Sequence, residues 1–166
     1  MRIYKFEMEQ WVARSTEEVF AFFSDPFNLD RITPPWLRFQ TTEAPKQVYR
    51  NCLLVHQLRI HGVPVTWVSQ IVEWDPPRRF IDVQVIGPYQ LWHHVHEFVP
   101  EGGGTRIRDV VCYALPFGWL GRWAHFLFVR RDLEQIFAYR RQQIERYFAP
   151  AADSPATPPG EPRAPA

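Results

Sequence analysis

Residues 90–115 read QLWHHVHEFVPEGGGTRIRDVVCYAL, and this stretch decides the fold. Apolar and aromatic residues recur at every second position on both sides of the glycine run. This alternation is typical of two β-strands, Gln90–Val99 and Thr105–Leu115. The turn between them, Glu101–Gly104, is short, which favours a hairpin over a crossover connection. The sequence therefore predicts an antiparallel sheet around this hairpin.

The segments on both sides extend the pattern. Five more strands are predicted at Ile3–Val12, Leu37–Thr42, Cys52–Ile60, Thr66–Trp74 and Arg79–Val85. Ser15-Thr16-Glu17-Glu18 is a capping box that opens a short helix, and a second short helix follows from Asp25 to Arg31. Apolar residues at three- and four-residue steps predict a long helix after Gly118 that ends near Phe148. This order of elements predicts an α+β fold, with an open antiparallel sheet packed on one long helix.

The length and composition of the chain indicate its domain organisation. The chain has 166 residues, of which 46% are hydrophobic and 22% charged, so it fits one globular domain, residues 1–148. Residues 149–166 are rich in proline and alanine and cannot bury apolar surface, so we expect a disordered tail. The net charge of +1 argues against a nucleic-acid partner. Aromatic residues reach 16%, which indicates a bulky core or an apolar cavity.

Other features indicate the compartment and the surface. Cys52 and Cys112 are too few for a disulfide framework and are expected to be buried and free. With no export signal and no long apolar run, we expect a cytoplasmic protein without stable membrane insertion. The apolar segment 116–123 is expected to be core, with a gate or a membrane-touching edge as the alternatives. The arginines of the long helix are expected on a solvated face: Arg130, Arg131, Arg140, Arg141 and Arg146.

Several local motifs match a known superfamily. They are Asn28-Leu29 with Ile32-Thr33-Pro34-Pro35-Trp36-Leu37, Gly87-Pro88-Tyr89, Trp92-x-His94-x-His96-x-Phe98, Asp109-x-Val111-x-Tyr113 with Pro116-x-Gly118, and Phe128-Val129-Arg130-Arg131-Asp132 with Phe137-x-Tyr139-Arg140. With the order of elements, they resemble the helix-grip proteins grouped as SRPBCC, which include START domains, plant pathogenesis-related allergens and polyketide cyclase/dehydrase-like proteins. The resemblance covers residues 1–148 and is to a bacterial ligand-binding branch. It implies a curved sheet wrapped around the C-terminal helix, an apolar ligand cavity and no settled activity.

The two central strands carry the polar candidates. Because side chains alternate, Trp92, His94 and His96 share the enclosed face of one strand, and Asp109 and Tyr113 share a face of the next. One register places His94 opposite Asp109 and His96 opposite Ile107, and a slip of one residue separates them. A carboxylate beside His94 would orient its ring and raise its basicity.

These residues lead to one function and two alternatives. The predicted function is binding or carriage of a small hydrophobic or amphipathic molecule, and the protein is expected not to be an enzyme. The predicted ligand-binding residues are Trp67, Gln84, Trp92, His94, His96, Asp109 and Tyr113. One alternative is a cofactor-independent cyclase or dehydratase that uses His94 with Asp109, with Tyr113 as a further donor. The other is a protein-interaction module, with which the proline-rich tail is compatible.

We expect no cofactor and no metal. Two histidines one residue apart on a strand can both bind zinc, but a third ligand would have to come from His56, His61 or Asp109. None of these three residues lies at a recognisable metal-ligand spacing.

Overall fold

The computed structural model describes residues 1–119, 123 and 125–149. The strands are β1 (Tyr4–Val12), β2 (Gln40–Glu43), β3 (Leu53–Ile60), β4 (Val63–Asp75), β5 (Arg79–Ile86), β6 (Leu91–Glu101) and β7 (Gly104–Ala114). The helices are α1 (Thr16–Ser24), α2 (Asn28–Arg31), the 3₁₀ helix η1 (Pro35–Leu37), the π-helix η2 (His125–Val129) and α4 (Arg130–Phe148).

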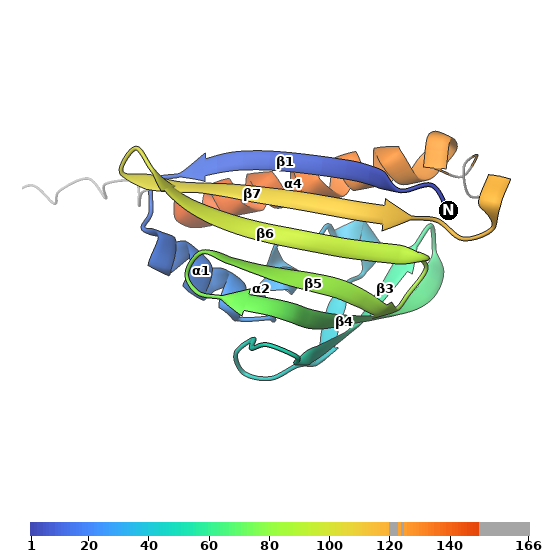
Figure 1. Ribbon diagram of the computed structural model, residues 1–166, viewed down its shortest axis with the longest axis horizontal. Coiled ribbons are helices and arrows are strands. Elements are labelled where there is room, and N and C mark those ends of the chain that lie inside the picture. Colours follow the sequence, from blue (N-terminus) through green and yellow to red (C-terminus); the bar gives the residue numbers. More distant parts are fainter. Residues whose placement is uncertain (120–122, 124, 150–166) are drawn as a thin grey trace, which may run out of the picture.

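The strands form one antiparallel sheet in the order β1-β7-β6-β5-β4-β3-β2. Figure 1 shows the sheet curved, with α1, α2 and α4 behind it, so all three helices cover the same face. The predicted α+β helix-grip architecture is therefore confirmed. No described helix has both the length and the apolar composition to cross a membrane.

The capping box forms as predicted. The Glu18 amide donates to the Ser15 hydroxyl at 3.2 Å, and the Ser15 amide donates to the Glu18 carboxylate at 3.2 Å. Together these two bonds satisfy donors that a helix start otherwise leaves unpaired. They fix the start of α1, and with it the position of Val19 and Phe20 in the core.

Three of the predicted starts differ from the observed ones by three residues, and the strand ends elsewhere differ by two residues at most. The helix predicted from Asp25 is only the single turn α2. The strand predicted from Leu37 begins at Gln40, because the proline pair before Leu37 starts the 3₁₀ turn η1 instead. Strand β4 begins at Val63 rather than Thr66, because the reversal needs only His61 and Gly62, both with positive φ.

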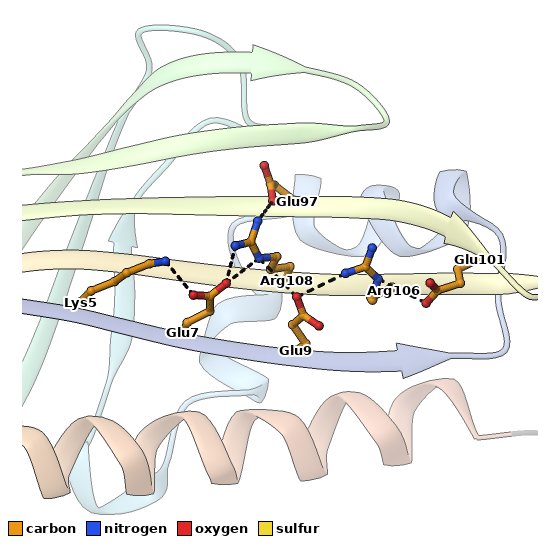
Figure 2. A network of polar contacts seen from close by, with 7 residues as sticks. All are labelled: Lys5, Glu7, Glu9, Glu97, Glu101, Arg106 and Arg108. Atoms are coloured by element: carbon orange, nitrogen blue, oxygen red, sulfur yellow. Dashed lines mark hydrogen bonds and ion pairs between the residues drawn. The ribbon is translucent and has the colours of Figure 1, made fainter.

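The outer face of β1, β6 and β7 is charged (Figure 2). Arg108 of β7 contacts Glu7 of β1 and, at 2.9 Å, Glu97 of β6. Arg106 contacts Glu9 and Glu101 on the same two strands. Since side chains alternate, this charged face places Ile107 and Asp109 of β7 on the inner, helix-covered face.

The inner face holds the core and the candidate site. One buried cluster contains Phe20, Phe22, Ile71 and Phe98 under α1 and the end of α4. A second contains Trp92, Tyr113, Leu133 and Phe137 near the start of α4. The core is therefore split into two parts along the sheet.

The segment after β7 does not join this core. Phe117, Trp119 and Trp123 have exposed fractions of 80%, 61% and 61%. The prediction that 116–123 is core is wrong for these three residues, because the chain leaves the sheet in a turn with φ 65° at Phe117. Residues 120–122 and the tail from 150 lie outside the described residues.

Candidate functional site

A cavity of about 530 Å³ lies between the inner face of the sheet and the helices. This volume suits a small organic molecule. Most of its wall is apolar, including Phe22, Leu54, Leu58, Trp67, Ile71 and Phe137. Two further lining residues, His61 of the β3–β4 turn and Asp132 of α4, contact each other at 2.7 Å (Nε2 to Oδ2) and so join opposite sides of the cavity.

Four ionisable side chains from β5, β6 and β7 meet at the sheet side of this cavity, and we call them the His–Asp cluster: Asp82, His94, His96 and Asp109. The Nε2 atom of His94 lies 2.9 Å from Asp109 Oδ1, and its Nδ1 atom lies 3.4 Å from Asp82 Oδ2. The Nε2 atom of His96 lies 2.9 Å from Asp82 Oδ2, and its Nδ1 atom lies 3.0 Å from Asp109 Oδ1. Each imidazole is thus placed between the same two carboxylates.

The strand register explains how His94 reaches Asp109. His96 lies opposite Asp109 and His94 opposite Val111, so the register considered from the sequence was wrong by two residues. The reversal is centred on Gly102 and Gly103, whose positive φ angles suit glycine. A shift of two residues keeps every side chain on its face, so His94 still contacts Asp109 along a diagonal.

Burial and contacts move the pKa values of the cluster in opposite directions. Burial alone would raise the pKa of Asp109, but its contacts with His94 and His96 hold that pKa well below the usual range. Burial lowers the pKa of His94, and the charge of His96 lowers it further. Burial would lower the pKa of His96 too, but the contacts with Asp109 and Asp82 outweigh it and raise that pKa. The surroundings therefore favour the neutral form of His94 and the protonated form of His96 relative to a free imidazole.

Hydrogen bonding within the cluster is incomplete. His96 Nδ1 lies close to Asp109 without a well-directed hydrogen bond, and Asp109 Oδ2 has no hydrogen-bond partner among the described residues. Both side chains are more than nine-tenths buried. Buried polar atoms normally have hydrogen-bond partners. These two atoms can therefore each form a further bond that no described residue of the protein supplies.

Asp82 and Arg140 belong to the site although the sequence analysis did not select them. Both line the cavity. Arg140 is buried, and its Nε atom has no hydrogen-bond partner; among the described residues no carboxylate lies within ion-pair distance of its guanidinium. Burial lowers its pKa, opposed by the charges of Asp109 and Asp82. The prediction of a solvated face is wrong for Arg140, because it follows Phe137 by three residues and precedes Ile144 by four, on the apolar face of α4.

The sequence-predicted ligand residues divide into two groups. Trp67, Trp92, His94 and His96 line the cavity. Asp109, Tyr113 and Gln84 are not part of its wall: Asp109 contacts the two histidines from β7, and Tyr113 packs against Trp92 and Tyr89. Gln84 donates to the Tyr89 carbonyl at 2.7 Å and accepts from the Tyr89 amide at 3.2 Å, so it holds the β5–β6 turn. None of these three residues is among those that line the cavity, and their contact with a ligand stays a prediction.

His56 also lines the cavity outside the cluster. Thr41 donates its hydroxyl to Asp30 at 2.6 Å and therefore accepts from His56 Nδ1, 3.1 Å away. This fixes the tautomer of a neutral His56, with Nε2 unprotonated. Burial lowers the pKa of His56 to about 4, against the smaller opposing effects of Asp82 and Asp30.

Solved structures with this architecture come from several organisms. TTHA0849 from Thermus thermophilus is 19% identical, with a TM-score of 0.65 over 87% of this chain and 99% of the other. The ginseng major latex-like protein 151 from Panax ginseng is 12% identical, with a TM-score of 0.67 over 89% and 99%. The Zhui aromatase/cyclase from Streptomyces sp. R1128 is 15% identical, with a TM-score of 0.66 over 89% and 98%. At these identities the similarity shows the fold.

The family comparison is more specific. None of the curated proteins searched matches this chain. Residues 4–148 match the family model described as polyketide cyclase / dehydrase and lipid transport. The match spans β1 to the end of α4, and thus every strand and helix that forms the cavity. The chain therefore belongs to the polyketide cyclase / dehydrase and lipid transport family, within the SRPBCC superfamily.

Proposed function

We propose that this protein binds a small amphipathic molecule in the cavity, with the apolar part against α1, α4 and β3 and the polar part at Asp82, His94, His96 and Arg140. The observation that carries the proposal is the composition of the cavity wall. It is apolar over most of its area and has convergent polar side chains at the sheet, the usual character of ligand sites. A purely apolar ligand would leave the polar atoms there without partners, which costs free energy.

The guanidinium of Arg140, which lies over the Phe137 ring and whose Nε makes no hydrogen bond within the described residues, favours an acidic polar group on the ligand. A carboxylate or an enolate can accept the hydrogen bonds that Arg140 Nε does not make within the described residues. His96 lines the same wall, and its raised pKa favours hydrogen-bond donation to such a group. Asp82 on the same wall would repel an acidic group, so we expect that group to lie next to Arg140 rather than next to Asp82.

A matched pair of tryptophan variants on β3 tests whether the cavity is the binding site. Leu54 is buried and lines the cavity, whereas Leu53 is 52% exposed on the opposite face of the same strand. We expect Leu54→Trp to abolish the fluorescence increase of anilinonaphthalene sulfonate, an acidic apolar probe, and Leu53→Trp to leave it unchanged. Equal probe binding by both variants, with native circular dichroism, would contradict the proposal.

The His–Asp cluster also favours a second candidate function. His94, held by Asp109 and with a lowered pKa, suits a base in its neutral form, and His96 beside it, with a raised pKa, suits the proton donor. This pair suits an enolisation or a dehydration of the bound molecule without a cofactor. Mass spectrometry of the recovered ligand after incubation with wild type and with His94→Gln tests it: we expect loss of water or rearrangement only with wild type, and an unchanged ligand in both samples would refute this function.

A further inference from the structure

The cavity-facing part of the His–Asp cluster has the geometry of a metal site. One ligand atom each from Asp82, His94 and His96 lie within 4.8 Å of one another. Asp82 Oδ2 is 3.4 Å from His94 Nδ1 and 2.9 Å from His96 Nε2. Tetrahedral zinc with metal–ligand distances of about 2.0–2.1 Å separates its ligand atoms by about 3.3 Å. Small side-chain movements would therefore suffice to place an ion between the three atoms.

Asp109 occupies the position of an outer partner. It accepts from His94 Nε2 at 2.9 Å, on the side of the ring opposite Asp82, and its Oδ1 is also 3.0 Å from His96 Nδ1. Histidines that bind metals almost always donate their other N–H to a carboxylate, a carbonyl or water, which fixes the ring and its tautomer. Asp109 is such a partner for His94, and its Oδ1 also lies next to the far nitrogen of His96, without a well-directed hydrogen bond.

The cluster also has unsatisfied bonding capacity. The buried His96 Nδ1 and Asp109 Oδ2 have no hydrogen-bond partner in the described part of the chain. In the form that binds a metal ion both imidazoles are neutral, and the two carboxylates and the guanidinium of Arg140 then sum to one net negative charge in a buried place. A cation at Asp82 would compensate that charge, which burial makes costly.

We propose that Asp82, His94 and His96 bind one divalent transition-metal ion of the zinc class, oriented by Asp109. Two imidazole nitrogens and one carboxylate oxygen select such an ion over magnesium or calcium, which prefer oxygen ligands. Three protein ligands leave a fourth position open toward the cavity, as in zinc sites that bind a water or a substrate. The use of that position rests on the proposed function, because only a ligand in the cavity can reach it.

The open position and Arg140 together define the ligand class. The ion leaves the site with one net positive charge, which an anionic oxygen would neutralise. Arg140 lines the same cavity and can bind a second oxygen of the same group. The site thus favours a carboxylate or an enolate that uses one oxygen on the metal and another on the guanidinium.

Calorimetric titration of the full chain, first treated with a chelator, tests the metal site with zinc and cobalt ions as probes. We expect one ion per chain with a dissociation constant below about 10 µM, and cobalt absorption bands typical of four- or five-coordinate nitrogen and oxygen ligation. His94→Gln, His96→Gln and Asp82→Asn should each weaken binding by at least about 100-fold. The matched control is His93→Gln, which removes the neighbouring histidine on the opposite face of β6.

The outcomes are distinct. Binding weaker than the stated limit in wild type, or equal loss in His93→Gln and His94→Gln, would overturn the metal site. Circular dichroism of each variant checks that lost binding is not lost folding, and the cobalt spectrum of wild type tests the ligand set without any substitution. Anilinonaphthalene sulfonate binding by the metal-free protein separates the two proposals: probe binding without metal binding overturns only the metal site, and metal binding without probe binding overturns only the proposed function.

Discussion

His56 should make the protein less stable in mild acid by an amount that can be worked out from its surroundings. The ring is 2% exposed, and burial lowers its pKa to about 4, compared with about 6.5 in an unfolded chain. Between these two values the unfolded state binds one more proton than the folded state does. The free energy of unfolding is therefore unaffected by His56 above about pH 6.5 and falls as the pH decreases from there toward 4.

The size of the effect follows from the two pKa values. At about pH 5 the linkage relation gives a loss of about 2 kcal/mol relative to neutral pH, and about 3 kcal/mol once the pH reaches 4. Other groups also titrate in this range, so the quantity to compare is the difference between wild type and His56→Gln. Glutamine can still donate to Thr41 but does not titrate, so the variant lacks this part of the acid response.

Urea unfolding at pH 8, 7, 6 and 5, with a chelator present throughout, measures the difference. We expect the unfolding free energy of wild type to fall by about 2 kcal/mol more than that of His56→Gln between pH 8 and pH 5. His93→Gln, on the outer face of β6, is the control and should follow wild type. Parallel curves for wild type and His56→Gln would refute the assignment of His56 as a buried neutral residue.

Three further predictions concern the scaffold and the cavity. Ser15→Ala should lower the unfolding free energy by about 1 kcal/mol in urea titration, because α1 loses its capping box; no change would contradict that role. Phe137→Ala should lower it by about 3–5 kcal/mol, because a ring that is 2% exposed and packs on Phe6 at 4.8 Å is removed from the core, and a loss under about 1 kcal/mol would argue against that packing. His61→Ala should leave stability almost unchanged but speed probe release in stopped-flow fluorescence, because the contact with Asp132 across the cavity is lost; unchanged release would show that the contact does not control exit.

Sequence reasoning recovered the fold because its signals are local. The capping box at Ser15 fixes the start of α1, and the paired glycines between β6 and β7 fix the position at which the chain reverses. Alternation alone assigned His94, His96 and Asp109 to the inner face, and that assignment survives a register error of two residues.

The site was recovered only in part, because its members are joined by tertiary structure. Asp82 lies 12 residues before His94 in the sequence and two residues after the buried Phe80. The alternation of side chains along β5 could therefore have predicted that Asp82 faces the cavity. Arg140 lies on the apolar face of α4, so the helical spacing from Phe137 and Ile144 could have predicted that it is buried. The curvature of the sheet brings β5, β6 and α4 around one cavity and decides which of their polar residues come into contact. No local sequence pattern predicts that curvature.

Native mass spectrometry of the purified protein, compared with the denatured and extracted sample, tests the central claim most directly. We expect a co-purifying or readily exchanged small amphipathic molecule with an acidic oxygen group, bound one per chain and absent from Leu54→Trp. A wild-type protein that carries no such molecule, and that takes up neither anilinonaphthalene sulfonate nor medium-chain fatty acids, would contradict the claim that this cavity is a ligand-binding site.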